Sequence, residues 1–177
     1  MIPLKGLDDA KSRLGGVLSR DERSELALQM LARVIGACHE ADLEVCVISP
    51  DPRARAEAER LGASSLDDGG ADLSGAVRLG LETYAEHEAV VAIAADLPFV
   101  TGEDVRELLE LARPLVVAAA LDGTSNAVAA RPPSALTPSY GPGSAARHGG
   151  LQIHRPRLEK DLDTPDDLAS WRSTLVV

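Results

Sequence analysis

An unbroken apolar run that stops at a single carboxylate is the feature that most limits the folds open to this chain. Residues 90–95 read Val-Val-Ala-Ile-Ala-Ala and are followed directly by Asp96, Leu97 and Pro98. Such a run is typical of a strand buried on both faces, as in a parallel sheet covered by helices. Open parallel sheets bind their ligands beyond the carboxyl ends of the strands. Asp96 is therefore expected at a ligand-binding edge, where it could hold a hard cation and the phosphates that the cation carries.

Strand and helix patterns alternate along the first two thirds of the chain. Ser19 and Glu22 form a capping box, and the helix after them has apolar residues at a spacing of four. Strands are expected at 1–4, 45–48, 63–66, 90–95 and 115–119, and further helices at 53–61, 72–85 and 101–112. This alternation predicts an α/β fold, a Rossmann-like, doubly wound and mostly parallel sheet in a single domain. Right-handed crossovers then bring the ends of these strands to one edge.

Composition and charge exclude several classes of partner. The formal net charge of −10 argues against nucleic acid, although Lys5, Lys11 and Arg13 gather positive charge near the start. These three residues could receive an anion or form a solvated basic loop. No stretch approaches the roughly 18 apolar residues of a membrane span, and no signal peptide opens the chain. Cys38 and Cys46 lie in apolar patterns, which indicates free thiols in a reducing compartment and predicts a cytoplasmic protein.

A second group of carboxylates stands near the C-terminus. Thr164 and Asp167 suit the N-cap and the third position of a helix, so capping explains them. Capping does not explain Asp161 and Asp163, which precede that helix. Because Mg²⁺ is commonly bound by one or two carboxylates together with substrate phosphates, either residue could join Asp96 in holding a divalent ion.

Two segments of small residues after residue 120 could bind anions. Residues 122–126 follow a predicted strand and could donate hydrogen bonds, or form an ordinary turn before a strand at 126–130. The glycines of 141–144 allow close backbone approach at the start of a short helix, where N–H groups attract anions. Arg147 and His148, one turn further on, either strengthen such a site or face solvent.

The sequence lacks the motifs of several common classes of enzyme and metal site. The chain has no Gly-x-Ser-x-Gly elbow, and neither cysteine has a convincing histidine partner. The four histidines do not have the spacing of zinc ligands. A Walker loop and a Gly-x-Gly-x-x-Gly motif after the first strand are also missing, which excludes the commonest classes of ATPase and dinucleotide-binding protein.

Taken in order, these motifs resemble those of the 2-phospho-L-lactate guanylyltransferase family of the deazaflavin-coenzyme pathway, whose members in some bacteria use phosphoenolpyruvate. The resemblance runs from residue 2 to about residue 171. It rests on these segments: Pro3-x-Lys5, residues 10–14, residues 95–98, Asn126, residues 141–144, Arg147-His148 and residues 161–165. Molybdenum-cofactor-type and sugar nucleotidyltransferases share the nucleotide-diphospho-sugar transferase fold and the aspartate at the strand end.

The resemblance implies transfer of GMP from GTP to phosphoenolpyruvate or 2-phospho-L-lactate, with release of pyrophosphate, in the biosynthesis of coenzyme F-420. Because the acceptor phosphate is already an anionic nucleophile, this reaction needs positioning and charge neutralisation more than a strong general base. The partners expected are GTP, a small phosphorylated three-carbon acid and Mg²⁺, without nucleic acid or membrane, and a homodimer is left open.

The resemblance also assigns roles by position. The catalytic residues would be Lys11, Arg13 and Asp96. The nucleotide would be bound by Lys5, Lys11, Arg13, Asp68, Gly70, Leu73 and Ser74. The acceptor would be bound by Thr124, Ser125, Asn126, Gly141, Gly143 and Ser144. The metal ligands would be Asp96 with Asp161 or Asp163.

The single domain expected over residues 1–177 would then have a nucleotide-binding half, 1–119, and an acceptor and second-metal-ligand half, 120–177. Two alternatives remain open on the sequence alone. One is a related nucleotidyltransferase that acts on a sugar phosphate or molybdopterin, and the other is a non-catalytic nucleotide-binding domain. Fold analogy does not choose among them.

Overall fold

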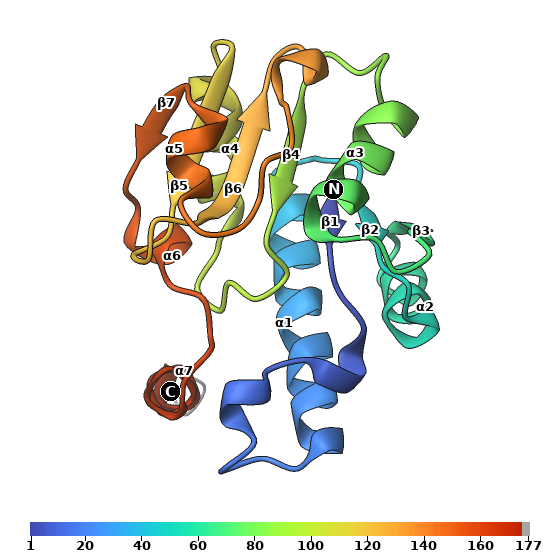
Figure 1. The fold of residues 1–177 in the computed structure, drawn as a ribbon, viewed down its shortest axis with the longest axis vertical. Coiled ribbons are helices and arrows are strands. Elements are labelled where there is room, and N and C mark those ends of the chain that lie inside the picture. The colour runs from blue at the N-terminus through green and yellow to red at the C-terminus, as the bar shows by residue number, and fades with distance from the viewer. Residues whose placement is uncertain (175–177) are drawn as a thin grey trace.

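A computed structural model describes residues 1–174 of the chain, and the last three residues of the expected domain, 175–177, lie outside the described residues (Figure 1). The strands are β1 (Ile2–Pro3), β2 (Cys46–Ile48), β3 (Ser64–Leu66), β4 (Val90–Ile93), β5 (Leu115–Ala119), β6 (Ser125–Ala130) and β7 (Leu151–Ile153). The helices are α1 (Arg20–Glu40), α2 (Pro52–Arg60), α3 (Leu73–Thr83), α4 (Gly102–Leu111), α5 (Ser144–His148), α6 (Pro156–Glu159) and α7 (Pro165–Thr174). Strand and helix alternate as the sequence predicts.

The strands form two sheets that meet edge to edge. One sheet has the order β1-β2-β3 and is parallel, and the other has the order β4-β6-β5-β7. The Met1 amino group donates to the Val91 carbonyl at 2.7 Å, and the Ile93 N–H donates to the Met1 carbonyl at 3.1 Å. This is the slanted pattern of a parallel pair, so β1 continues onto β4. Among the strands of residues 1–174, β6 alone runs antiparallel to its neighbours, which confirms the mostly parallel sheet.

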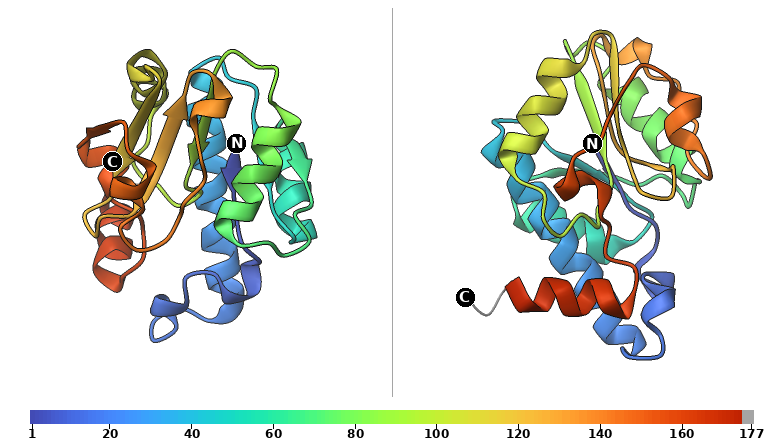
Figure 2. Two further views of the ribbon diagram at one scale, coloured as in Figure 1. Left: turned by 45° about the horizontal axis from the view of Figure 1, so that its top comes forward. Right: turned by 90° about the vertical axis from the view of Figure 1, so that its left-hand side faces the viewer.

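Helices cover both faces of the sheet, as the apolar strand runs predict. Alternate residues of β4 show the division, because side chains point to opposite faces of a strand. Val91 and Ile93 pack in a core with residues of α1, α2, α4 and α6. Val90 and Ala92 pack in a second core with residues of α3 and α5. Figure 2 shows the sheet edge-on between these two helical layers.

The helix starts confirm the capping patterns. Ser19 and Glu22 form the expected capping box at α1, and Thr101 forms another with Asp104 at α4. Thr164 and Asp167 exchange hydrogen bonds at the start of α7, as predicted. No helix within residues 1–174 is both long enough and apolar enough to cross a membrane.

The main differences from the expected elements lie after residue 149. Strand β7 (Leu151–Ile153) and helix α6 (Pro156–Glu159) lie in a segment where the sequence predicts no regular element. Both are short, and β7 exposes two of its three residues, so neither produces a clear apolar period. They matter for function because they carry the chain from the sheet to Asp161 and Asp163.

Candidate active site

The loop after β1 brings positive charge to the carboxyl edge of the sheet. Its backbone makes two short 3₁₀ turns, at Leu7–Asp9 and Ser12–Leu14, and the side chains of Leu7 and Leu14 are fully buried. Lys11 lies between these turns in the left-handed region, at φ 52°. The buried leucines anchor the loop, and the left-handed residue between them reverses the chain and aims the Lys11 side chain inward.

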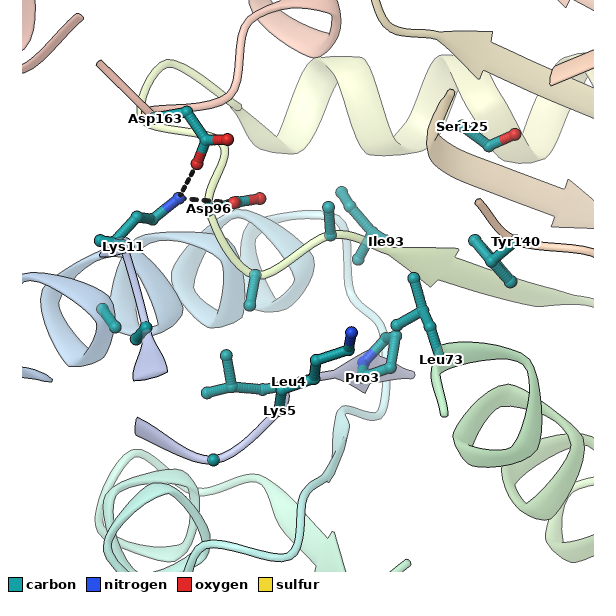
Figure 3. Close-up of a pocket in the computed structure, with 15 residues that line it drawn as sticks. Pro3, Leu4, Lys5, Lys11, Leu73, Ile93, Asp96, Ser125, Tyr140 and Asp163 are labelled. Atoms are coloured by element: carbon teal, nitrogen blue, oxygen red, sulfur yellow. Dashed lines mark hydrogen bonds and ion pairs between the residues drawn. The ribbon is translucent and has the colours of Figure 1, made fainter. Parts of the chain in front are cut away.

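The ammonium group of Lys11 lies between two carboxylates that are far away in the sequence. Its Nζ is 2.6 Å from Asp96 Oδ2 and 3.0 Å from Asp163 Oδ1 (Figure 3). Burial alone would lower the pKa of Lys11, but Asp96 and Asp163 outweigh that effect and raise it above its usual value. Lys11 is therefore charged at neutral pH. The more exposed Arg13 adds a contact of 3.1 Å to Asp163.

Asp96, Asp161 and Asp163 form a three-carboxylate cluster next to Lys11. Each offers an oxygen, and these oxygens all lie within 4.8 Å of one another. The Leu162 N–H donates to the Asp96 carbonyl at 3.1 Å, which ties the turn after β4 to the segment that carries the other two aspartates. Burial, then the charges of Asp96 and Asp163, raise the pKa of Asp161 to about 6. Such a crowded set of oxygens could hold a divalent cation. Lys11 and these three aspartates are called the charged end of the site.

A cleft of about 320 Å³ extends from the charged end along the edge of the sheet. Pro3, Leu4, Ile93 and Leu73 give it apolar walls, and Lys5 also lines it (Figure 3). Apolar walls with a few charged groups at one end suit a small ligand with both a ring system and phosphates. The cleft lies where the sequence places a ligand edge.

The residues expected against the base divide into two sets. Leu73 lines the cleft, and the Ser74 hydroxyl accepts a hydrogen bond of 3.0 Å from the Tyr140 N–H. Asp68 and Gly70 form the exposed turn that leads to α3, where Asp68 Oδ1 accepts from the Gly70 N–H at 3.2 Å. This turn lies outside the lining of the cleft.

The residues expected at the acceptor are also placed differently from one another. Ser125 lines the cleft, and its N–H donates to the Ser144 hydroxyl at 2.9 Å. Thr124 instead donates its N–H and hydroxyl to Asp122, at 2.9 and 2.6 Å, and so closes a turn. Asn126 is buried, and its Nδ2 donates to the Leu158 carbonyl at 2.9 Å. Its amide thereby ties β6 to α6 rather than facing the cleft.

The loop before α5 brings Ser144 to Ser125. Gly141 and Gly143 have φ values of 112° and 71°, which side chains disfavour. Arg147 donates to the carbonyls of Ser139 and Tyr140, and also bonds the Pro142 carbonyl, so it braces the loop from outside. The sequence leaves open whether Arg147 strengthens an anion site or faces solvent, and in the structure Arg147 is exposed and uses its guanidinium to brace this loop.

Two residues that the sequence does not predict at the site, Asp51 and Tyr140, contribute to it, and His148, for which the sequence leaves open a place at the site or in solvent, contacts Ser125. Asp51 is buried, and its Oδ2 accepts from the Leu7 N–H at 2.9 Å, which holds the loop that carries Lys11. His148 contacts Ser125, and Tyr140 lines the cleft beside it. The residues around Asp51 are typical of an ordinary turn, and a single histidine or tyrosine does not form a recognisable sequence pattern. These contacts are therefore visible only in the folded structure. Ser125, Ser144 and His148 are called the neutral end of the site.

Comparison with known proteins gives the family. The model of the guanylyl transferase CofC-like family matches residues 1–157. A phosphoenolpyruvate guanylyltransferase of Rubrobacter xylanophilus is 42% identical over 185 residues, which cover 96% of this chain and 90% of that protein. One of Sphaerobacter thermophilus is 36% identical over 185 residues, covering 95% of this chain and 89% of that protein.

Solved structures share the fold at much lower identity. A putative nucleotide-diphospho-sugar transferase of Desulfovibrio desulfuricans superposes with a TM-score of 0.76 at 18% identity, over 99% of this chain and 86% of its own. The 2-C-methyl-D-erythritol 4-phosphate cytidylyltransferase of Thermus thermophilus gives 0.63 at 19% identity, over 84% and 89%. The fold is thus that of nucleotidyltransferases, and the chain belongs to the guanylyl transferase CofC-like family, as the sequence motifs predict.

Proposed function

We propose that this chain transfers the GMP group of GTP to phosphoenolpyruvate and releases pyrophosphate. The observation that carries the proposal is the charged end, where Lys11 meets Asp96 and Asp163 at the mouth of an apolar cleft. The family and the names of the relatives supply the donor and the acceptor. The product of this reaction would enter the biosynthesis of coenzyme F-420.

Phosphate recognition falls to the basic residues of the loop after β1. Lys11 is held at the charged end, while Lys5 lines the cleft and Arg13 approaches Asp163 from the exposed side. Together they would neutralise the triphosphate of GTP. Leu73 would pack on the guanine, with Ser74, Asp68 and Gly70 in the segment around it.

The acceptor would lie between the two ends of the site. Ser125 at the cleft wall, with Ser144 and the backbone of Gly141 and Gly143 behind it, offers hydrogen-bond donors to an acid. Thr124 and Asn126 would contribute through the turn and the strand that hold Ser125 in place. This assignment keeps the nucleotide-binding half, 1–119, distinct from the acceptor half, 120–177.

Magnesium is the cation that fits this donor set. Carboxylate oxygens are its usual protein ligands, and Asp96 with Asp163 or Asp161 presents them close together. When bound there, Mg²⁺ would supply positive charge to the phosphates of both substrates. We assign Asp96 and Asp163 first, because both line the cleft.

The bonds formed and broken in this reaction balance without a further reactant. An oxygen of the acceptor phosphate bonds to the α-phosphorus of GTP, and the bond from that phosphorus to the bridging oxygen of the β-phosphate breaks. Pyrophosphate leaves with the electron pair of that bond. Lys11 lies where negative charge grows, and preorganised charge of this kind is commonly a large part of an enzyme's rate enhancement. No proton needs to be removed from the nucleophile.

The test is an acceptor panel with the purified chain. We expect release of pyrophosphate from GTP and MgCl₂ only when phosphoenolpyruvate is added, and a GMP-linked product by mass spectrometry. Parallel reactions use 2-phospho-L-lactate, a sugar phosphate and molybdopterin, and ATP or CTP replaces GTP. Turnover with another acceptor in place of phosphoenolpyruvate would overturn the choice of substrate. Tight, magnesium-independent GTP binding without turnover would favour a non-catalytic domain instead.

A further inference from the structure

His148 contacts Ser125, a residue of the cleft wall, without lining the cleft itself. Its Nδ1 is 2.9 Å from Ser125 Oγ, and its Nε2 is 3.0 Å from the backbone nitrogen of Ser139. The imidazole also meets the Tyr140 ring edge-on, with the ring centroids 4.8 Å apart. Three neighbours therefore fix the orientation of this ring.

The contact with Ser139 decides which nitrogen of His148 carries the proton. A backbone N–H can only donate, so Nε2 must accept and cannot carry hydrogen. Burial, with the charge of Arg147 as a second cause, lowers the pKa of His148 and favours the neutral ring. A neutral ring without hydrogen on Nε2 has it on Nδ1, and that hydrogen points at Ser125 Oγ.

The hydrogen bonds of Ser144 can be assigned to donors and acceptors in the same way. Its side chain is fully buried, its oxygen accepts from the Ser125 N–H, and its hydroxyl donates to Ser125 Oγ at 3.1 Å. Ser125 Oγ therefore accepts twice, from His148 and from Ser144. Both of its lone pairs are used, and its own hydrogen has no acceptor inside this network. Because Ser125 lines the cleft, that hydrogen is left for a ligand.

We propose that His148 is a positioning residue that makes Ser125 an obligatory hydrogen-bond donor toward the carboxylate of the acceptor. This rests on the proposed function, which places a phosphorylated acid in the cleft. Figure 3 draws Ser125 and Tyr140 at one end of the cleft and Lys11, Asp96 and Asp163 at the other. The reacting phosphate belongs at the charged end, so the anionic group near Ser125 is the carboxylate. A hydroxyl that can only donate favours the ionised carboxylate, whose charged oxygens are stronger acceptors than the carbonyl oxygen of an amide.

The tautomer of His148 can be measured without any substrate. We expect long-range ¹H–¹⁵N spectra of the imidazoles to show His148 with hydrogen on Nδ1 and a bare Nε2. The spectrum of His148→Asn assigns the signal by its disappearance. Hydrogen on Nε2 in the folded chain would overturn the inference, whatever the activity of the protein.

A double-mutant cycle tests whether His148 acts through Ser125. His148→Phe keeps the ring against Tyr140 but loses both hydrogen bonds, and it should raise KM for phosphoenolpyruvate about 10- to 100-fold while KM for GTP stays within about 2-fold. Ser125→Ala should do the same. The double variant should be no worse than Ser125→Ala alone, because the two substitutions remove one interaction. Additive losses, or an equal rise in KM for GTP, would overturn the inference.

Two further variants separate positioning from a general loss of structure. His148→Asn retains an N–H donor near the position of Nδ1 and should recover part of the lost affinity. His154→Phe is the matched control, because His154 is exposed and its side chain pairs with Glu159 on α6, away from Ser125 in the sequence. It should leave both KM values unchanged. Equal losses in His154→Phe and His148→Phe would overturn a role specific to His148.

An acceptor analogue identifies the group that Ser125 contacts. Ethyl phosphate carries the phosphate without the carboxylate, and its inhibition constant should be the same for the native chain and for His148→Phe. Equal weakening of ethyl phosphate and phosphoenolpyruvate would overturn the carboxylate assignment. Failure of the native chain to release pyrophosphate with any acceptor would instead overturn the proposed function, and the tautomer measurement then judges His148 by itself.

Discussion

The two ends of the cleft solve the same problem, recognition of an anion, by different physical means. The charged end places Lys11 between Asp96 and Asp163, and full charges at 2.6 and 3.0 Å dominate it. The neutral end has no full charge, because Ser125 and Ser144 are hydroxyls and the lowered pKa of His148 favours its neutral ring. It offers one hydroxyl hydrogen whose direction is set by the hydrogen bonds around it.

This difference predicts how each end responds to substitution. A charge acts over several ångströms and is expensive to leave unpaired in a partly buried site. A directed hydroxyl acts only at contact distance, and it loses its value when its neighbours stop orienting it. Losses at the charged end should therefore be larger and affect both substrates. Losses at the neutral end should be smaller and affect the acceptor alone.

The largest loss is expected for Asp96→Asn. The amide has the shape of the carboxylate but cannot balance Lys11 or hold a divalent cation as firmly, so kcat/KM should fall by about 10³-fold. Steady-state pyrophosphate release measures this, and circular dichroism should show an unchanged fold. Asp166→Asn is the control, because Asp166 is exposed in the first turn of α7. Retention of more than a tenth of the activity in Asp96→Asn would contradict a catalytic charged end.

A smaller loss is expected for Lys11→Met. Methionine fills the buried stem of Lys11 but leaves Asp96 and Asp163 without their ammonium partner. We expect kcat/KM for GTP to fall by about 10²-fold, with part of the loss recovered at high magnesium because a cation then neutralises the carboxylates. Lys160→Met, at an exposed position close by in the sequence, should change little. A loss confined to KM for the acceptor would contradict the prediction that the charged end acts on both substrates.

The charged end was largely predictable from the sequence, and the reason is physical. A carboxylate that directly follows a buried apolar run, such as Asp96, is costly to bury unless it has a partner, so its presence indicates a site. Asp161 and Asp163 remained unexplained after helix capping was accounted for. The alternation of apolar strands and amphipathic helices likewise predicted the mostly parallel sheet between two helical layers.

The neutral end was only partly predictable. Ser125 and Ser144 lie in segments typical of turns, and the sequence around His148 suits a site residue as well as a solvent-exposed one. Their roles depend on which nitrogen or oxygen donates, and that follows from contacts between segments far apart in the chain. Asn126 shows the same limit, since its amide is used by the Leu158 carbonyl of α6. Spacing in a sequence does not reveal such pairings.

The smallest effect on activity is expected at Asp51, which supports the charged end only through the backbone of Leu7. The guanidinium of Arg53 and the N–H groups of Leu7 and Arg53 lower the pKa of Asp51 to about 2. A lowered pKa in the folded state stabilises the protein above the unfolded value of about 3.9, and this contribution is lost as the pH falls toward 2. Asp51→Asn should lower the free energy of unfolding by roughly 1–3 kcal/mol at pH 6, because one amide oxygen cannot replace two carboxylate oxygens.

The pH dependence of that loss distinguishes a charge effect from a packing effect. Urea unfolding at several pH values should show the difference between native chain and Asp51→Asn shrinking from pH 5 to pH 3, while kcat/KM at pH 7 falls only about 2- to 5-fold by the small shift expected in the loop. Asp67→Asn is the matched control, because Asp67 is an exposed carboxylate that pairs with the partly buried Arg55, and its loss should cost less than about 1 kcal/mol. A loss in Asp51→Asn that stays constant with pH would mean that shape, and not charge, holds the loop that carries Lys11.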